Sequence, residues 1–218
     1  LGQSGLKVSE ICLGTMAFGS RADEAESLRL VDLALEGGIN FFDTAELYPV
    51  PARKETQGET ERIIGTWFKR SGKRKDIILA SKIAGPAEMT RHIRTGGFKK
   101  EELEDAIHKS LKRLQTDYID LYQVHSIASL DDAKDIGKKG KVLEVLHNYR
   151  DQGIIKHIGF TGHTTAEGMK KAAELYDFEV MMIALNHTYH NGNESSDEHV
   201  VPFSANKGMG IVAMKVIR

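Results

Sequence analysis

Four side chains with proton-transfer chemistry stand at the ends of apolar runs. Asp43 closes NFFD and Tyr48 lies five residues later, while Lys82 follows DIILAS and His125 follows IDLYQV. A phenol needs help to act as a general acid, because its ordinary pKa is about 10. A nearby cation lowers that pKa, and a hydrogen bond from a histidine orients the hydroxyl group. These four residue types therefore indicate one site of acid–base chemistry.

Strands must bring these residues together, because they are far apart in the sequence. We expect Asp43, Lys82 and His125 each to lie where a strand ends, with Tyr48 just beyond the first of these ends. In a parallel α/β sheet or barrel, all such strand ends open on one face, so distant residues converge there.

Strand-like and helix-like segments alternate along the whole chain. Short runs rich in Ile, Leu, Val or Phe are typical of strands covered on both faces, and they predict strands at Glu10–Thr15, Asn40–Asp43, Asp76–Ser81, Ile119–Val124, Lys156–Thr161, Val180–Leu185 and Gly210–Lys215. Apolar residues at helical spacing predict helices at Glu24–Glu36, Glu59–Arg70, Lys100–Leu114, Lys141–Gln152, Thr165–Tyr176 and Asp197–Lys207.

Six βα units followed by a seventh strand fit either a doubly wound sheet or a (β/α)8 TIM barrel. The barrel is favoured, because no G-x-G-x-x-G follows the first strand and the polar residues stand at several separate strand ends. An eight-stranded barrel usually needs about 250 residues. We therefore expect residues 1–218 to form a single α/β domain, a C-terminally incomplete barrel with about seven of its eight βα units.

Composition excludes several classes of function. The formal net charge of −1 provides no field that would recruit nucleic acid or an anionic membrane, and no apolar stretch reaches the roughly 18 to 20 residues of a membrane span. No signal peptide is visible. The single cysteine, Cys12, excludes an internal disulfide and predicts a buried structural thiol in a reducing, cytoplasmic setting. The basic run Lys69–Lys75 is interpreted as a solvated loop.

Several long motifs occur in the order typical of the aldo-keto reductases. They are GLKVSEICLGTMAFG, GGINFFDTAELY, ASK, SLKRLQTDYIDLYQVH and GIIKHIGFTGH. The chain resembles this family from about Gly5 to its end. The resemblance implies a (β/α)8 barrel and an NAD(P)H-dependent oxidoreductase that reduces aldehyde or ketone carbonyls. The first half is similar to the shaker-β-related branch and the second half to another bacterial branch, which fits either a natural divergent member or a hybrid of two barrels.

The resemblance gives each of the four residues a role. Tyr48 would be the general acid in carbonyl reduction, and Lys82 would lower the pKa of its phenol. Asp43 would pair with Lys82, and His125 would orient the carbonyl oxygen. The nicotinamide would supply the hydride, while the protein supplies orientation and electrostatics.

The resemblance also implies a cofactor site at the same strand ends. Its expected residues are Gly14, Thr15, Met16, Asp43, Thr161, Gly162, His163, Asn186, Met214 and Lys215. The family commonly has a Ser-Asn pair where this chain has Thr161 and His163, and a stacking Tyr where it has Met214. Family habit favours NADPH, with NAD as the alternative.

Other interpretations stay open at this point. The fold also occurs in cofactor-binding regulatory or scaffold proteins with little turnover, and a truncated or hybrid barrel without activity is a third reading. His187 and His190 have the spacing H-x-x-H but no accompanying carboxylate motif, so we expect no metal site there. The only partner we expect is a small carbonyl substrate, and the sequence does not determine an oligomeric state.

Overall fold

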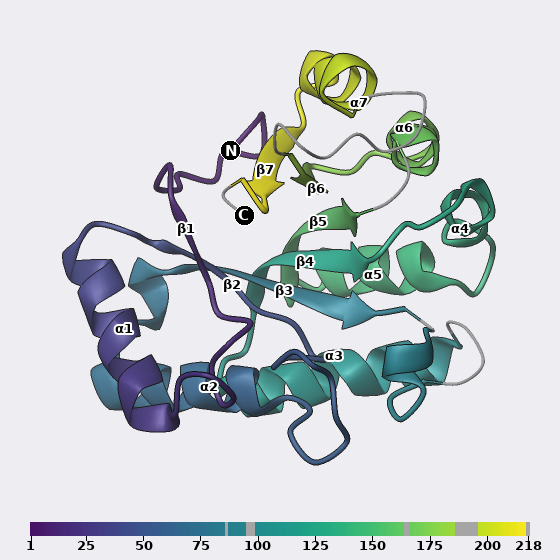
Figure 1. Cartoon of the computed structure of the whole chain (residues 1–218). Helices are drawn as coiled ribbons and strands as arrows, with labels where there is room; N and C mark the ends of the chain where they lie inside the picture. The colour runs from purple at the N-terminus through teal and green to yellow at the C-terminus, as the bar shows by residue number, and fades with distance from the viewer. Residues whose placement is uncertain (86, 95–98, 164–165, 186–195, 217–218) are drawn as a thin grey trace.

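Seven strands form one parallel sheet, and each strand pairs with the next one in the sequence. The computed structural model describes residues 1–85, 87–94, 99–163, 166–185 and 196–216. The strands are β1 (Cys12–Gly14), β2 (Phe41–Asp43), β3 (Ile78–Ala84), β4 (Ile119–His125), β5 (Ile155–Gly162), β6 (Val180–Ala184) and β7 (Gly210–Met214). The sheet order β1-β2-β3-β4-β5-β6-β7 is that of a curled barrel wall (Figure 1) and excludes the doubly wound alternative.

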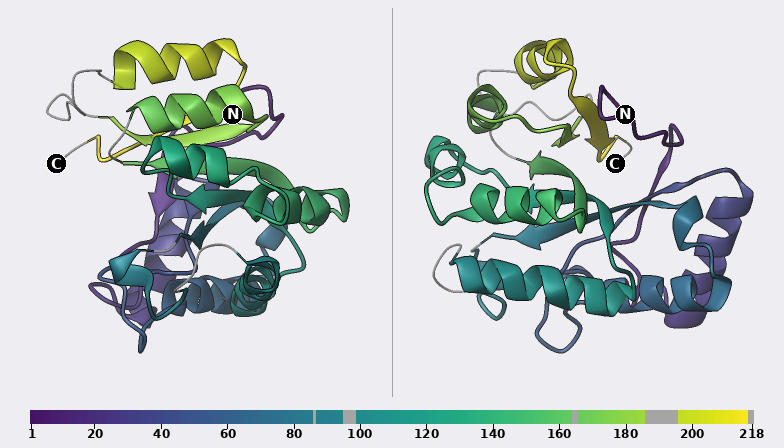
Figure 2. Two further views of the ribbon diagram at one scale, coloured as in Figure 1. Left: turned by 90° about the vertical axis from the view of Figure 1, so that its right-hand side faces the viewer. Right: turned by 180° about the vertical axis from the view of Figure 1, so that it is seen from behind.

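Helices cover the outside of the curved sheet (Figure 2). They are α1 (Glu24–Glu36), α2 (Glu59–Ser71), α3 (Lys100–Leu114), α4 (Leu130–Asp135), α5 (Val142–Asp151), α6 (Ala166–Leu175) and α7 (Ser196–Asn206). The predicted bounds of α1 and α3 are confirmed, and those of α2, α5, α6 and α7 differ by one residue at one end or both. The short helix α4 was not predicted, because six residues are too few to show a helical period.

Two predicted strands need correction. The first strand is shorter than expected and covers only Cys12–Gly14. The third strand begins two residues later than predicted and continues to Ala84, so Lys82 lies inside β3 rather than after its end. Strand pairing explains the difference, because Lys82 and Ala84 pair with Gln123 and His125 of β4.

Alternating side chains separate the inside of the barrel from the helix layer. Phe41, Ala80, Leu121 and Val180 pack together inside the barrel, with Val212 against them. Their neighbours in the sequence point outward into one continuous core beneath the helices, which includes Phe42, Leu79, Tyr122, Met181 and Ile211. Successive side chains of a strand point to opposite faces of the sheet, so each strand contributes side chains to both of these layers.

Trp67 is a packing residue, as its place in a helix pattern predicts. It is fully buried within α2 and contacts Phe42 and Phe68 edge-on or tilted. Its indole nitrogen donates to a carboxylate oxygen of Asp32 at 2.6 Å, which ties α2 to α1.

The basic run Lys69–Lys75 is not wholly a solvated loop. Arg74 lies in a 3-10 turn, and its guanidinium stacks between the rings of Phe68 and Tyr118. It also forms a largely buried ion pair with Asp120 at 2.8 Å. The sequence interpretation is wrong for this residue, because aromatic surface from a distant segment covers the arginine and a carboxylate neutralises it.

The N-terminal residues lie against the start of β7. The amide of Gln3 donates to the carbonyl of Gly208 at 2.7 Å.

Among the described helices, none combines the length and the apolar character needed to cross a bilayer.

Candidate active site

Asp43, Lys82 and Tyr48 form a continuous chain of contacts. Asp43 ends β2 and Lys82 projects from β3, and the register places these strands side by side. The Lys82 ammonium donates to a carboxylate oxygen of Asp43 at 2.5 Å and to the phenol oxygen of Tyr48 at 3.3 Å. A third bond, to the carbonyl of Thr44 at 2.9 Å, fixes the ammonium from behind. Three groups predicted from two separate segments are thus brought together.

Burial makes these contacts electrostatically strong. Lys82 is 1% exposed and Asp43 is 7% exposed. Burial alone would lower the pKa of Lys82, but the charges of Asp43 and Tyr48 and their hydrogen bonds raise it above its ordinary value. Lys82 therefore stays a cation at neutral pH.

Burial raises the pKa of the Tyr48 phenol, and the charge of Lys82 offsets only part of that rise. The charge and the hydrogen bond of Lys82 act to lower this pKa, as expected, but the net pKa is raised. The sequence indicated the cation but not the burial of the phenol, which is the larger effect. The phenol is consequently protonated at neutral pH, with a cation 3.3 Å from its oxygen.

Gln123 is a site residue that the sequence analysis missed. It precedes His125 by two positions on β4, so both project from the same face of the strand. Its side-chain amide donates to the other oxygen of Asp43 at 3.4 Å. Its own amide oxygen is buried without a hydrogen-bond partner. The period of two from His125 was the signal that could have identified it.

His125 contacts another histidine. Its Nε2 lies 3.2 Å from Nε2 of His163, which follows β5, so one ring donates and the other accepts. Burial, together with the charges of Lys82 and His163, lowers the pKa of His125 to about 3. Burial, with the charges of Lys215 and Lys82, lowers that of His163 to about 4. Both rings are therefore neutral at physiological pH.

A cavity of about 490 Å³ opens beside these groups. Tyr48, His125 and His163 line it, together with apolar side chains that include Met16, Leu47, Val50 and Met89. Such a cavity, mostly apolar with a few convergent polar groups, is typical of a small-molecule site. The loop after Tyr48 contributes Val50 to the wall, and the segment after β3 contributes the 3-10 turn Glu88–Thr90.

The segment after β1 supports the site from the other side. The hydroxyl and amide of Thr15 both donate to the carbonyl of Asp43, at 2.8 and 3.0 Å. Met16 is exposed and lines the cavity, and nothing lies within 4 Å of the position that a side chain on Gly14 would take. Thr15 thus holds Asp43 in place, while Gly14 and Met16 border open space.

Residues at the end of β5 carry unused polar atoms. The hydroxyl of Thr161 and Nδ1 of His163 are buried without a hydrogen-bond partner, as is Nδ1 of His125. Gly162 has a packing reason for its residue type, since a Cβ there would lie 2.3 Å from the sulfur of Met169 in α6. Buried polar atoms normally find partners, so a polar group bound here would satisfy them.

The remaining expected residues differ in where they lie. Met214 ends β7 half-buried, and Lys215 lines the cavity. Asn186, His187 and His190 lie outside the described residues.

Within the described ranges, no three His, Cys, Asp or Glu side chains gather as metal ligands would. Cys12 is half-buried, and burial beside Asp43 raises the pKa of its thiol, which keeps it unreactive.

Sequence comparisons relate the chain to bacterial proteins. It is 35% identical over 226 residues to "Protein tas" of Escherichia coli K12, covering 96% of this chain and 65% of that protein. It is 34% identical to the uncharacterized oxidoreductase YrpG of Bacillus subtilis, covering 98% of this chain and 64% of that protein. The chain therefore spans slightly less than two thirds of the length of these relatives.

Solved structures show the same architecture. A putative aldo-keto reductase of Pseudomona aeruginosa superposes with a TM-score of 0.75 at 28% identity, covering 98% of this chain and 75% of that one. The aldo-keto reductase AKR11C1 of Bacillus halodurans, in its holo form, gives 0.74 at 31% identity over 98% and 64% of the two chains. These likenesses confirm the predicted barrel fold with about seven of its βα units. The aldo/keto reductase family model matches residues 10–218, and the chain belongs to this family.

Proposed function

We propose that this protein reduces aldehyde or ketone carbonyls to alcohols, with NADPH as the hydride donor. The observation that carries the proposal is the buried chain Asp43–Lys82–Tyr48, which ends with a phenol in the wall of a mostly apolar cavity. Membership of the aldo/keto reductase family supports nicotinamide-dependent carbonyl chemistry. The choice of NADPH over NADH rests on family habit.

In this proposal Tyr48 donates a proton to the carbonyl oxygen of the substrate. Its buried phenol stays protonated until it is needed, because burial holds its pKa high. Once the proton leaves, the ammonium of Lys82 faces the phenolate at 3.3 Å and stabilises it. Asp43 keeps Lys82 charged, and the neutral ring of His125 orients the carbonyl oxygen.

The residues around this phenol fit a nicotinamide cofactor. Its carboxamide both donates and accepts hydrogen bonds, and Thr161, Gln123 and His163 carry buried atoms that need such partners. When bound, the cofactor supplies the hydride. Met214 would pack softly against a ring face, and Lys215 borders the same cavity. We further propose that residues 1–218 form one barrel domain that works in the reducing cytoplasm.

Tyr48→Phe tests the proposal against a matched control. Tyr149 is a comparably buried tyrosine on α5 whose hydroxyl bonds His108 and which does not line the cavity. Loss of NADPH absorbance is followed with a panel of small aldehydes. General acid catalysis typically contributes about 10²- to 10⁴-fold, so Tyr48→Phe should lose that much kcat while Tyr149→Phe keeps it. Absence of turnover by the intact protein, or equal activity of both variants, would contradict the proposal. Tight NADPH binding without turnover would instead favour the regulatory alternative.

A further inference from the structure

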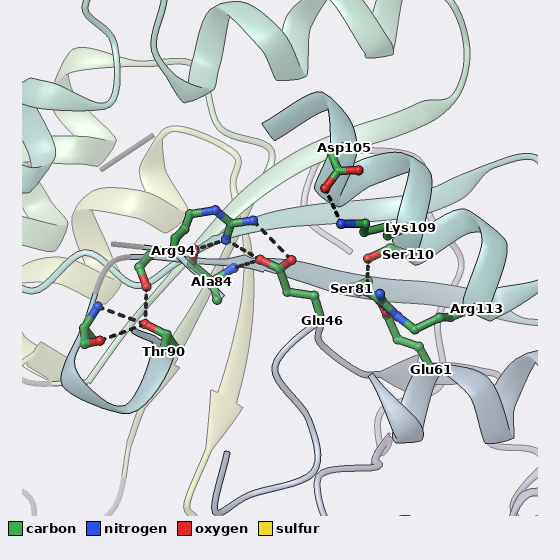
Figure 3. Close-up of polar contacts among 12 residues, drawn as sticks. Glu46, Glu61, Ser81, Ala84, Thr90, Arg94, Asp105, Lys109, Ser110 and Arg113 are labelled. Carbon is green, nitrogen blue, oxygen red and sulfur yellow. Dashed lines mark hydrogen bonds and ion pairs between the residues drawn. The ribbon is translucent and has the colours of Figure 1, made fainter. Parts of the chain in front are cut away.

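A buried ion pair next to the proposed catalytic groups has no role in the chemistry described so far. Glu46 lies between Asp43 and Tyr48 in the sequence and is 2% exposed, and Arg94 follows the 3-10 turn after β3 and is 5% exposed. The guanidinium donates to both carboxylate oxygens of Glu46, at 2.5 and 3.3 Å. It also donates to the carbonyl of Ala84 at the end of β3 (Figure 3).

The backbone that follows β2 turns away from the edge of β3, and the side chain of Glu46 continues the hydrogen bonding to β3 at that point. Beyond Asp43, the amides of Thr44 and Glu46 still donate to the carbonyls of Ala80 and Lys82, at 2.9 and 3.2 Å. The next donor along β3 is the amide of Ala84, and it bonds the carboxylate of Glu46 at 2.6 Å instead of a backbone carbonyl.

Because a side-chain carboxylate takes the place of a backbone carbonyl here, the main chain can turn back toward β3. The amide of Tyr48 donates to the carbonyl of Ala45 at 3.1 Å, which closes the turn that carries the phenol to Lys82. The carboxylate of Glu46 thus satisfies the edge of β3 that the turning backbone exposes. Arg94 neutralises the carboxylate and caps the same strand end through the carbonyl of Ala84.

We propose that Glu46 and Arg94 are positioning residues that set the distance between the Tyr48 phenol and the Lys82 ammonium. Neither touches the reacting atoms, and both act through the turn between β2 and Tyr48. The inference rests on the proposed function, since it gives that distance its purpose. Arg94 has a second effect, because its amide bonds Thr90, whose hydroxyl donates to Gly85, and this fixes a turn that lines the cavity.

The chain provides a matched control in a second ion pair with a buried glutamate, which also hydrogen-bonds to β3. Glu61 of α2 is fully buried, accepts from the Arg113 guanidinium at 2.7 Å and accepts from the hydroxyl of Ser81 at 2.6 Å. Ser81 neighbours Lys82 on β3, so this pair joins α2 and α3 to the same strand (Figure 3). The carboxylate of Glu61 bonds Ser81 and Arg113 rather than residues 44–48. Replacing either glutamate disrupts an ion pair that bonds β3, and we expect only the Glu46 replacement to displace the Tyr48 phenol.

The test compares Glu46→Leu and Glu46→Gln with Glu61→Leu and Glu61→Gln. Gln keeps an acceptor for the Ala84 amide whereas Leu removes it, so kcat should fall about 100-fold in Glu46→Leu and about 10-fold in Glu46→Gln, as a misplacement of about 1 Å implies. The KM for NADPH should change less than about threefold in the Glu46 variants. Glu61 variants of equal thermal stability should keep kcat within about threefold, because the carboxylate of Glu61 bonds no residue of the turn. Equal kcat losses in both pairs, or unchanged kcat in folded Glu46→Leu, would overturn the inference. If Glu46→Leu does not fold, Arg94→Met replaces it with the same expectations.

Hydrogen exchange separates failure of this inference from failure of the proposed function. Amides of residues 44–48 should exchange at least about tenfold faster in Glu46→Leu than in wild type and Glu61→Leu, since local opening sets the exchange rate. This readout needs no turnover. If the wild-type protein reduces no aldehyde while exchange still rises in Glu46→Leu, the proposed function fails, but the role of Glu46 and Arg94 in holding the turn is supported. Unchanged exchange in Glu46→Leu would overturn the inference that Glu46 and Arg94 hold the turn.

Discussion

Replacing Asp43 by Asn should destabilise the fold strongly at neutral pH and much less at alkaline pH. The Lys82 ammonium is almost fully buried and would keep only neutral partners, namely the carbonyl of Thr44, the phenol of Tyr48 and the amide oxygen of the new side chain. Removing one member of a buried ion pair typically costs about 3–5 kcal/mol. The variant can limit this cost by releasing the Lys82 proton, which requires about 1.4 kcal/mol for each unit between the ambient pH and the unfolded pKa of about 10.4. The loss is therefore limited to roughly 4.6 kcal/mol at pH 7 and roughly 2 kcal/mol at pH 9.

The sign of the pH dependence differs between the two proteins. In wild type the pKa of Lys82 is raised, so its stabilising contribution is complete below the unfolded pKa and is lost only as pH rises through the folded value. In Asp43→Asn burial dominates and the folded pKa falls below the unfolded one. The unfolded chain then binds more protons, and the variant gains stability as pH rises from 7 to 9 while wild type gains none from this group.

Urea unfolding followed by circular dichroism at pH 7 and pH 9 measures both effects. The double variant Asp43→Asn, Lys82→Met removes the unpaired charge and should recover most of the loss. Asp105→Asn breaks an exposed ion pair with Lys109 and serves as the control, which should change the free energy of unfolding at neither pH 7 nor pH 9. A loss below about 1 kcal/mol at pH 7, or one of equal size at both pH values, would refute the argument from the buried pair.

Three further predictions concern other parts of the structure. Gly65→Ala should lower the free energy of unfolding by more than about 2 kcal/mol in urea titration, although Ala favours helices, because its Cβ would lie 2.1 Å from a backbone carbonyl oxygen of α3. Trp67→Phe leaves a cavity and removes the bond to Asp32, and should cost about 2–4 kcal/mol by the same measurement. His125 and His163 have lowered pKa values of about 3 and about 4, so the unfolded chain binds more protons as pH falls below about 6.5 and stability drops there. Replacing both with Gln should flatten this loss by about 2 kcal/mol per pH unit, about 1 for each histidine, read from unfolding curves at pH 6 and pH 5.

The arrangement of strands and helices was largely predictable from local signals. Helices α1 and α3 were placed at their observed bounds because their apolar residues recur at helical spacing. The short apolar runs and the absence of a dinucleotide motif favoured the barrel over a doubly wound sheet. Exact strand ends were not predictable, since β3 extends beyond Lys82 only because β4 lies beside it and pairs as far as His125.

The sequence by itself also identified Asp43, Tyr48, Lys82 and His125 as residues able to move protons, because side-chain type and position after an apolar run are local properties. Only the tertiary structure determined how they act together. Burial, which raises the pKa of the Tyr48 phenol, depends on what covers the residue. The partner of His125 turned out to be His163, 38 positions away, and Glu46 found Arg94 across 48 positions. Distances, desolvation and pairing of this kind arise from contacts between distant segments, and local sequence patterns do not encode them.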